Sequence, residues 1–357
     1  MSNSVSAVCY NTRRDMSAMR LAVISDIHLV GPAELALAND SYGQLRTHPD
    51  RLTRAWRSGL YRVRRRFWNG HLRWRHTAFL QALDELSDRK PDWVIANGDY
   101  GGDLGGVGLS HGATLDSARI VVDAIRACFP ERSRFVFGDH DLGKYSTVLR
   151  EGGIRLHSLE VGERQLQIPS FWHETVGAFH LIGLNSSLFT LDLFLPEALA
   201  HEVPEWQRRR VEHIEQVTHA FQSLPPRARV ILFCHDPSAL TALAQLPVVQ
   251  RHLPQIELTV IGHLHSPTLL RVARYAARVS RLKPRYPVAR IVASGLAGAR
   301  HWNQFHPVVC PSTFGTGHHV AGGLLLVQSD PSGRLVARRV RVHRRHYKHH
   351  KARGGHA

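Results

Sequence analysis

The chain has 357 residues, of which 43% are hydrophobic and 8% aromatic. This composition is typical of a globular protein and excludes a largely disordered chain. No apolar run reaches the roughly 18 residues that a membrane-spanning helix needs. The four cysteines are widely spaced, which excludes a disulfide scaffold and a cysteine-based zinc site and favours a reducing compartment.

The net charge of +17 is concentrated in three segments. Residues 41–76 contain ten Arg and one acid, residues 271–290 contain six Arg and one Lys, and residues 338–353 contain eight Arg or Lys. The rest of the chain is mildly acidic. Basic segments on an acidic body indicate a polyanionic partner, either nucleic acid or an anionic membrane surface, with solvated surface charge as the alternative.

The two ends of the chain differ in composition from the middle. Residues 1–18 are polar and lack the apolar stretch of a secretory signal. We therefore expect a disordered leader there, or a start codon assigned too early, and, by default, a cytoplasmic protein. Residues 343–357 form a basic, His-rich tail. A single domain is expected over residues 19–342.

Apolar runs and amphipathic patterns alternate along the first two thirds of this domain. Strands are expected at 21–24, 93–96, 134–137, 179–184, 230–233, 258–261, 324–327 and 335–342, with shorter strands within 154–183. Helices are expected around 79–86, 114–128 and 204–223. Strands that alternate with helices early and gather late predict an α/β sandwich with mixed sheets.

Five of the apolar strands end in short clusters of Asp and His. The clusters are Asp26 with His28, Asp99, Asp139 with His140, His235, and His263 with His265. Because ligands in α/β folds bind beyond the carboxyl ends of strands, these clusters are expected to converge on one point.

The clusters contain three Asp and five His. Carboxylates and imidazoles are ligands for Mn²⁺, Fe or Zn²⁺, and the lack of thiolate disfavours a structural zinc site. Seven of these eight residues could bind metal, which leaves one for acid/base work. Seven ligands are too many for one metal ion with open coordination positions, but they suit two ions that share a carboxylate. Two ions about 3.5–4 Å apart clamp a phosphoryl group and activate water, which is the chemistry of phosphate ester hydrolysis.

The same blocks resemble the calcineurin-like metallophosphoesterase family, whose pattern is D-x-H, GD, GNH-D/E, H and GH-x-H. Here the blocks read Asp26-Ile27-His28, Gly98-Asp99, Gly138-Asp139-His140-Asp141, His235 and Gly262-His263-Leu264-His265, in the family's order. The resemblance implies a four-layer α/β/β/α sandwich of two mixed sheets.

The resemblance also implies a role for each residue. Asp26, His28 and His265 match the ligands of a first metal, and Asp99 matches the bridging carboxylate. Asp139, His235 and His263 match the ligands of a second metal. His140 matches a catalytic acid that does not bind metal, and Asp141 would orient His140. The cofactors would be two divalent or mixed-valence ions (Mn, Fe or Zn), with a metal-bridged hydroxide as nucleophile.

Asp139 departs from the family, which has Asn at this position. The extra negative charge should hold the second ion more tightly and reduce its Lewis acidity. The alternative is that Asp replaces Asn with little effect.

Two basic helical insertions, at about 31–75 and 268–288, follow the metal-binding blocks that end in His28 and His265. In the first, apolar residues from Leu52 to Phe67 recur on one helical face among arginines. Such segments fit an anionic membrane interface, a cap packed on the domain, or a nucleic-acid surface. The sequence leaves these three roles open.

The sequence thus predicts a metal-dependent phosphate ester hydrolase acting on a phosphodiester or pyrophosphate rather than a small monoester. The substrate is expected to be membrane-lipid-linked, by analogy with the family's UDP-diacylglucosamine hydrolase branch, and the protein peripheral on the inner membrane face. A nuclease or nucleotide phosphodiesterase is the alternative enzyme, and a catalytically silent binding protein is the alternative of another class. No protein partner can be deduced.

Overall fold

The computed structural model describes residues 19–37, 72–102, 104, 106–144, 152–265, 270–271, 298–313, 322–330 and 332–342. The predicted leader (1–18) and tail (343–357) lie outside the described residues. So do the two predicted basic insertions, apart from residues 31–37, 72–75 and 270–271.

The described strands form two five-stranded sheets with the orders β10-β9-β1-β2-β3 and β4-β5-β6-β7-β8. The first sheet contains β1 (Arg20–Ile24), β2 (Trp93–Ala96), β3 (Ser133–Phe135), β9 (Gly323–Ser329) and β10 (Leu335–Arg341). The second contains β4 (Phe171–Val176), β5 (Phe179–Leu184), β6 (Arg229–Cys234), β7 (Ile256–Ile261) and β8 (Pro307–Val309). Both sheets are mixed: β1, β2 and β3 are parallel, as are β5 to β8, whereas β9, β10 and β4 pair antiparallel.

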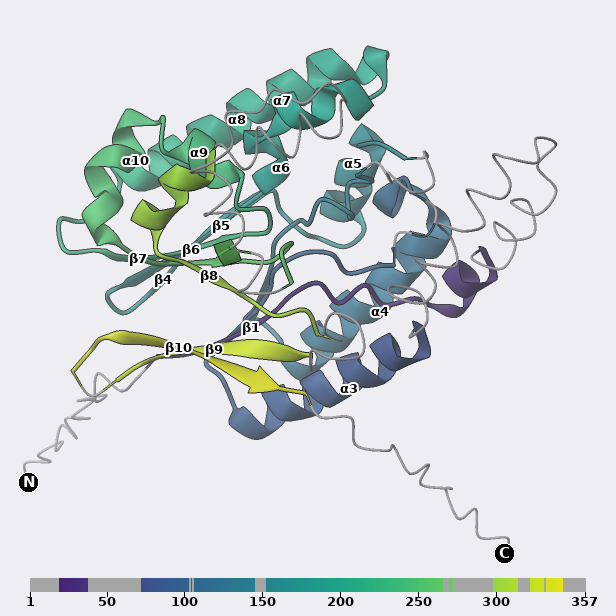
Figure 1. The fold of residues 1–357 in the computed structure, drawn as a ribbon, viewed down its shortest axis with the longest axis horizontal. Coiled ribbons are helices and arrows are strands. Elements are labelled where there is room, and N and C mark those ends of the chain that lie inside the picture. The colour runs from purple at the N-terminus through teal and green to yellow at the C-terminus, as the bar shows by residue number, and fades with distance from the viewer. Residues whose placement is uncertain are drawn as a thin grey trace, which may run out of the picture.

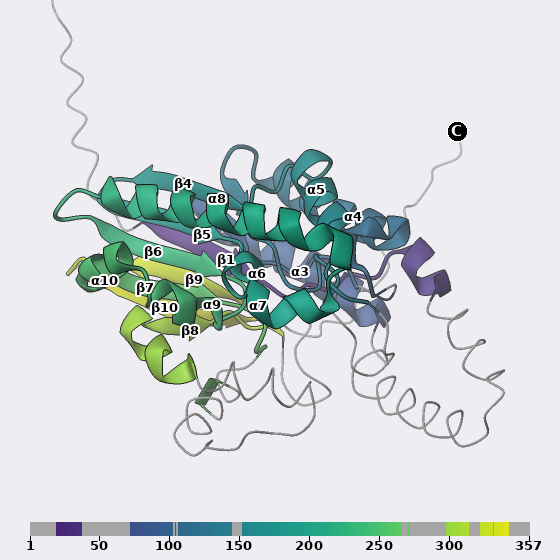
Figure 2. The same ribbon diagram turned by 90° about the horizontal axis from the view of Figure 1, so that it is seen from above.

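Helices cover the outer face of each sheet (Figures 1 and 2). The first sheet packs against α3 (Leu72–Arg89), α4 (Gly112–Cys128) and α5 (Leu156–Arg164). The second packs against α8 (Val203–Gln222), α9 (Ala239–Leu243) and α10 (Pro247–His252), with the short helices α6 (Ser186–Phe189) and α7 (Leu191–Phe194) beside them. A third apolar cluster lies between the two sheets. The predicted α/β/β/α sandwich is therefore confirmed.

Alternation along β1 shows how one strand serves two layers. Leu21 and Val23 lie in the cluster between the sheets, whereas Ala22 and Ile24 lie in the cluster under α3 and α4. All four residues are fully buried. A strand buried on both faces is apolar throughout, which explains the unbroken apolar run in the sequence.

Several elements differ from the expectation. Residues 156–164 were expected in short strands but form α5, whose buried residues include Leu159 and Val161. A nine-residue segment that contains Ser and Gly has little intrinsic preference for the helical conformation. Its packing against the apolar cluster on the outer face of the first sheet stabilises the helix. α3 also begins earlier than expected, at Leu72, inside the predicted insertion.

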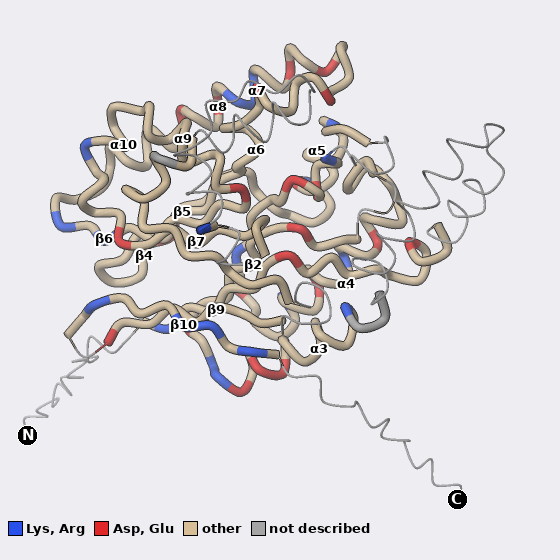
Figure 3. Tube along the Cα trace, in the orientation of Figure 1, with Lys and Arg blue, Asp and Glu red and all other residues tan. Residues whose placement is uncertain are grey.

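Basic residues lie along β10 at the edge of the first sheet (Figure 3). Arg338 and Arg341 are exposed on this strand, which pairs on one side only among the described residues. Charged side chains at an edge oppose pairing with another chain. The first part of the basic segment 338–353 thus belongs to the sheet. In the part of the chain that the structure describes, no helix has both the length and the apolar character needed to cross a bilayer.

α8 buries a histidine whose titration should affect stability. His213 is 1% exposed and packs edge-on against the rings of Phe171 and Phe189. Burial lowers the pKa of His213 to about 3, from 6.5 in an unfolded chain. His213 is therefore neutral in the folded protein over the usual pH range.

We predict that His213→Phe reduces the acid sensitivity of folding. Below pH 6.5 the unfolded chain takes up a proton on this residue that the folded chain does not. This difference destabilises the wild type by about 1.4 kcal/mol per pH unit down to about pH 3. Urea unfolding between pH 5 and 8 should show a shallower loss of stability in the variant. His219→Gln, at an exposed position of the same helix, is the control; equal pH dependence in all three proteins would contradict the prediction.

Candidate metal centre

All the predicted site residues follow the carboxyl ends of parallel strands from both sheets. Asp26 and His28 follow β1, Asp99 follows β2, and Asp139 with His140 follows β3; His235 follows β6, and His263 with His265 follows β7. Backbone hydrogen bonds join the loops that follow β1 and β2, since Asp26 N–H donates to Gly98 O (3.1 Å) and His28 N–H donates to Asp99 O (2.9 Å).

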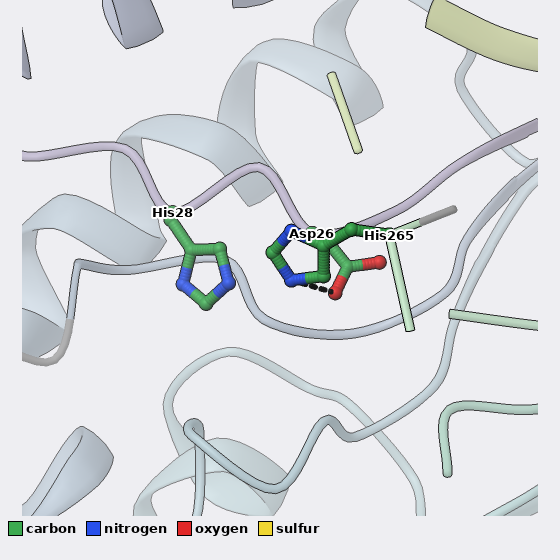
Figure 4. Close-up of side chains that lie close together, drawn as sticks. All are labelled: Asp26, His28 and His265. Atoms are coloured by element: carbon green, nitrogen blue, oxygen red, sulfur yellow. Dashed lines mark ion pairs between the residues drawn. The ribbon is translucent and has the colours of Figure 1, made fainter. Parts of the chain in front are cut away.

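Asp26, His28 and His265 place one ligand atom each within 4.8 Å of the others (Figure 4). His265 Nε2 lies 3.1 Å from Asp26 Oδ1, and the rings of His28 and His265 are 5.7 Å apart. The structure thus brings together the three residues that match the first metal, although His265 is more than 200 positions from the other two in the sequence.

Asp139, His235 and His263 form a second such group. Asp139 Oδ1 lies 3.3 Å from His235 Nε2 and 3.2 Å from His263 Nδ1. Asp99 lies between the two groups: its Oδ2 is 3.4 Å from His28 Nε2 and 3.1 Å from His235 Nε2. A single carboxylate oxygen therefore faces one imidazole from each group, as a shared ligand would.

Two residues that the sequence analysis missed orient these ligands. The Asn97 carbonyl lies 2.7 Å from His235 Nδ1, which leaves Nε2 directed at the carboxylates. The Ser25 hydroxyl donates to Asp26 Oδ2 at 2.7 Å, so that Oδ1 faces His265. Partners of this kind fix a ligand's tautomer and orientation. Both residues stand beside a ligand block, but a polar residue at a strand end is too common a signal to select them.

The backbone at the site is held in a rarely populated conformation. Among the nine non-glycine residues with positive φ that the described chain contains, five are predicted metal ligands. These are Asp26, His28, Asp99, His263 and His265, with φ between 44° and 60°. Left-handed backbone at non-glycine residues costs free energy and tends to occur at functional sites. The surrounding packing must therefore sustain this arrangement.

The three central carboxylates are buried and yet held in the charged form. Burial raises the pKa of Asp99, but His235, His140 and His28 together lower it below the usual range. For Asp139, burial is outweighed by His263 and Lys144, and the pKa lies well below its ordinary value. Burial lowers the pKa of His235, but Asp99 and Asp26 raise it well above the ordinary value.

These residues fit two divalent ions. Oxygens of Asp26, Asp99 and Asp139 surround the buried Nε2 of His235 at 3.9, 3.1 and 3.3 Å. Several carboxylates buried together need cations, because an uncompensated buried charge costs several kcal/mol. The donor set consists of carboxylate oxygens and imidazole nitrogens, which Mn²⁺, Fe and Zn²⁺ accept.

His140 and Asp141 lie at the same edge. His140 shares a group with Asp99 and Asp139, and its backbone N–H donates to Asp99 Oδ1 at 3.0 Å. Asp141 accepts backbone N–H bonds from Asp99 (2.9 Å), Tyr100 (3.0 Å) and Gly138 (2.8 Å). Burial and the charge of Asp99 raise the pKa of Asp141 to about 7. The carboxylate therefore holds the backbone of Asp99, a role that the sequence did not predict; its role in orienting His140 stays a prediction.

A model of the calcineurin-like phosphoesterase family matches residues 19–267. The chain belongs to this family. The resemblance predicted from the five blocks is thereby confirmed, and with it a metal-dependent phosphoester hydrolase. The matched region contains all seven predicted metal ligands together with His140 and Asp141.

Solved structures of low sequence identity align with this calcineurin-like phosphoesterase. A dimetal phosphatase from Danio rerio is 13% identical, with a TM-score of 0.46 and coverage of 92% of this chain and 100% of the other. GAP50, the anchor in the inner membrane complex of Plasmodium, is 11% identical, with a TM-score of 0.45 and coverage of 92% and 86%. The phosphopantetheinyl hydrolase of Mycobacterium tuberculosis is 13% identical, with a TM-score of 0.33 and coverage of 70% and 84%. No curated protein matches the chain.

We predict that Gly138→Ala weakens metal binding by about 10- to 100-fold, the range seen when residues that orient ligands are changed. A Cβ at Gly138 would overlap the carboxylate and the backbone of Asp99. Gly112→Ala is the matched control, because a Cβ there meets nothing within 4 Å. Calorimetric titration of the metal-free proteins with Mn²⁺ measures the effect. Wild-type affinity in Gly138→Ala would show that the close approach of Gly138 to Asp99 does not hold the ligand in place.

Proposed function

We propose that this calcineurin-like phosphoesterase uses a two-ion centre to hydrolyse a phosphodiester or pyrophosphate whose remainder is lipid-linked. The observation that carries the two-ion assignment is the position of Asp99 Oδ2, which faces His28 on one side and His235 on the other. With Asp26 and His265 completing one group and Asp139 and His263 the other, the seven residues divide into two sets around one shared carboxylate.

Each set would hold one ion, and Asp99 would serve both. The ions, when bound, supply Lewis acidity at the phosphoryl group and activate water for attack. His140 lies beside Asp99 and Asp139 on the third strand-end loop and is partly exposed. It is suited to hydrogen-bond a phosphate oxygen and to give a proton to the leaving group. Asp141 keeps the backbone of Asp99 in place through its three N–H bonds.

The proposed substrate class is supported by where the basic segments join the fold. The segment 266–297 directly follows His265, and the segment 38–71 begins ten residues after His28. The rings of His28 and His265 are 5.7 Å apart, so the two segments follow, in the sequence, blocks that carry residues of the same metal group. Basic segments that follow both of these blocks in the sequence support a substrate held at an anionic surface rather than a small monoester.

The corresponding domain arrangement is a single phosphoesterase domain over 19–342 with two inserted basic segments, a leader and a basic tail. The proposed location is the cytoplasm, with peripheral association at the inner membrane face. A nuclease would use the same segments to hold nucleic-acid phosphates. Manganese is the first metal to test, because it accepts both carboxylate and imidazole ligands.

We predict that His140→Ala retains both ions but loses about 10²–10⁴ in rate, as expected for removal of a general acid. Asp99→Ala should instead lose one or both ions, because it removes the shared ligand. Elemental analysis after gel filtration, together with turnover of an aryl phosphodiester with Mn²⁺, separates the two outcomes. His219→Ala, exposed on α8, should match the wild type. Loss of metal in His140→Ala would show that His140 is a metal ligand. Unchanged turnover would show that His140 takes no part in the reaction.

We predict salt-sensitive binding to anionic but not neutral lipid vesicles. Each Arg near such a surface contributes about 1 kcal/mol, so replacing Arg274, Arg278 and Arg281 by Gln should weaken sedimentation with vesicles by about 100-fold. The control replaces three exposed arginines elsewhere, Arg132, Arg208 and Arg251, and has the same net charge. Equal binding to neutral vesicles, or none to either, would favour a packed cap. Tight salt-sensitive binding to single-stranded DNA would favour the nuclease.

A further inference from the structure

Lys144 lies against the second metal group, five residues after Asp139. Its Nζ is 2.5 Å from Asp139 Oδ2 and 3.4 Å from His263 Nε2. Asp139 is fully buried, and the Lys144 side chain is 28% exposed. The chain contains only five lysines among 46 basic residues, and one of them places its ammonium at the single ligand position where the sequence departs from its family.

The loop between the two residues is closed on itself. Lys144 N–H donates to Asp139 O at 3.1 Å, and Gly143 N–H donates to His140 O at 3.1 Å. Gly143 has φ of 95°, which only glycine adopts readily. The turn therefore returns the chain to the position from which the lysine side chain reaches the carboxylate.

The two oxygens of Asp139 have different surroundings. Oδ1 faces His235 Nε2 (3.3 Å) and His263 Nδ1 (3.2 Å), whereas Oδ2 faces the ammonium of Lys144. One oxygen is thus directed at the metal group and the other is held by a cation. An Asn side chain would present the same arrangement, with its carbonyl oxygen toward the metal and its neutral NH₂ on the other side.

We propose that Lys144 is a positioning residue that neutralises Asp139, so that the Asp139–Lys144 pair presents one oxygen and the net charge of an amide to the second ion. This inference rests on the proposed two-ion function. It changes the expectation drawn from the sequence: the ligand shell with its lysine has a net charge of two negative units, as it would with Asn, and the second ion keeps its Lewis acidity.

The test compares metal affinity in four variants by calorimetric titration of metal-free protein with Mn²⁺. Asp139→Asn leaves Lys144 facing the ion without its counter-charge, so the second ion should bind about 1000-fold more weakly, the order expected for one unit charge about 4 Å away at an effective dielectric of about 20. Lys144→Met should bind it about tenfold more tightly. The double variant Asp139→Asn/Lys144→Met should return to within about threefold of the wild type, as should Lys144→Arg.

Asp139→Asn/Lys90→Met is the matched control, since it removes one Lys at an exposed position and has the same net charge as the double variant. It should bind the second ion as weakly as Asp139→Asn alone. A double variant that binds as weakly as this control, or Lys144→Met with wild-type affinity, would overturn the inference. Steady-state kinetics with an aryl phosphodiester provide a second readout. A raised KM with unchanged metal affinity in Lys144→Met would assign Lys144 to the substrate phosphate and reject the proposed role.

The wild-type titration keeps the two proposals distinct. If the wild type binds a single ion or none, the two-ion function fails, and this inference with it. The wild type could instead bind two ions and turn over the diester, while Lys144→Met binds Mn²⁺ like the wild type and the double variant binds it like Asp139→Asn. In that case only the proposed role of Lys144 fails. Circular dichroism and thermal unfolding of each metal-free variant establish that the compared proteins are folded.

Discussion

Three carboxylates are buried together at the edge where the two sheets present the carboxyl ends of their parallel strands. Asp26, Asp99 and Asp139 are each at most 1% exposed, and all lie within 3.9 Å of His235 Nε2. Such a cluster is unfavourable unless cations and hydrogen bonds compensate it. The Ser25 hydroxyl and the His263 backbone N–H, which donates to Asp26 Oδ1 at 3.1 Å, supply part of this compensation. The remainder is what makes the edge a site for divalent ions.

The geometry of this cluster depends on how the two sheets pack. Asp26, Asp99 and Asp139 come from the first sheet, whereas His235, His263 and His265 come from the second. The apolar layer between the sheets, in which Val23 packs with residues such as Phe233, sets their separation. A change in that layer would move the imidazoles relative to the carboxylates. The core between the sheets therefore affects the distances between the imidazoles and the carboxylates although it does not contact the substrate site, because protein interiors transmit small displacements.

The sequence allowed much of this arrangement to be predicted. Apolar runs that end in Asp or His indicated the strands, and the blocks at their ends indicated which side chains the structure brings together, because parallel strands place their carboxyl ends together. The helix α5 was missed because its nine residues have weak periodicity and form a helix through tertiary packing. The partners of the ligands were missed for a related reason: Asn97, Ser25 and the backbone bonds of Asp141 act through contacts that no spacing rule encodes.

Asp139 shows why the charge of a metal shell cannot be counted from motif residues alone. A carboxylate in place of an amide adds one negative charge when the ligands are considered by themselves. In the folded chain the added charge faces an ammonium at 2.5 Å, and the lysine comes from outside the family blocks. The relevant quantity is the field at the ion, to which every nearby fixed charge contributes whether or not it is a ligand. A substitution that changes a ligand's charge can therefore leave that field nearly unchanged when the fold places an opposite charge on the ligand's other oxygen.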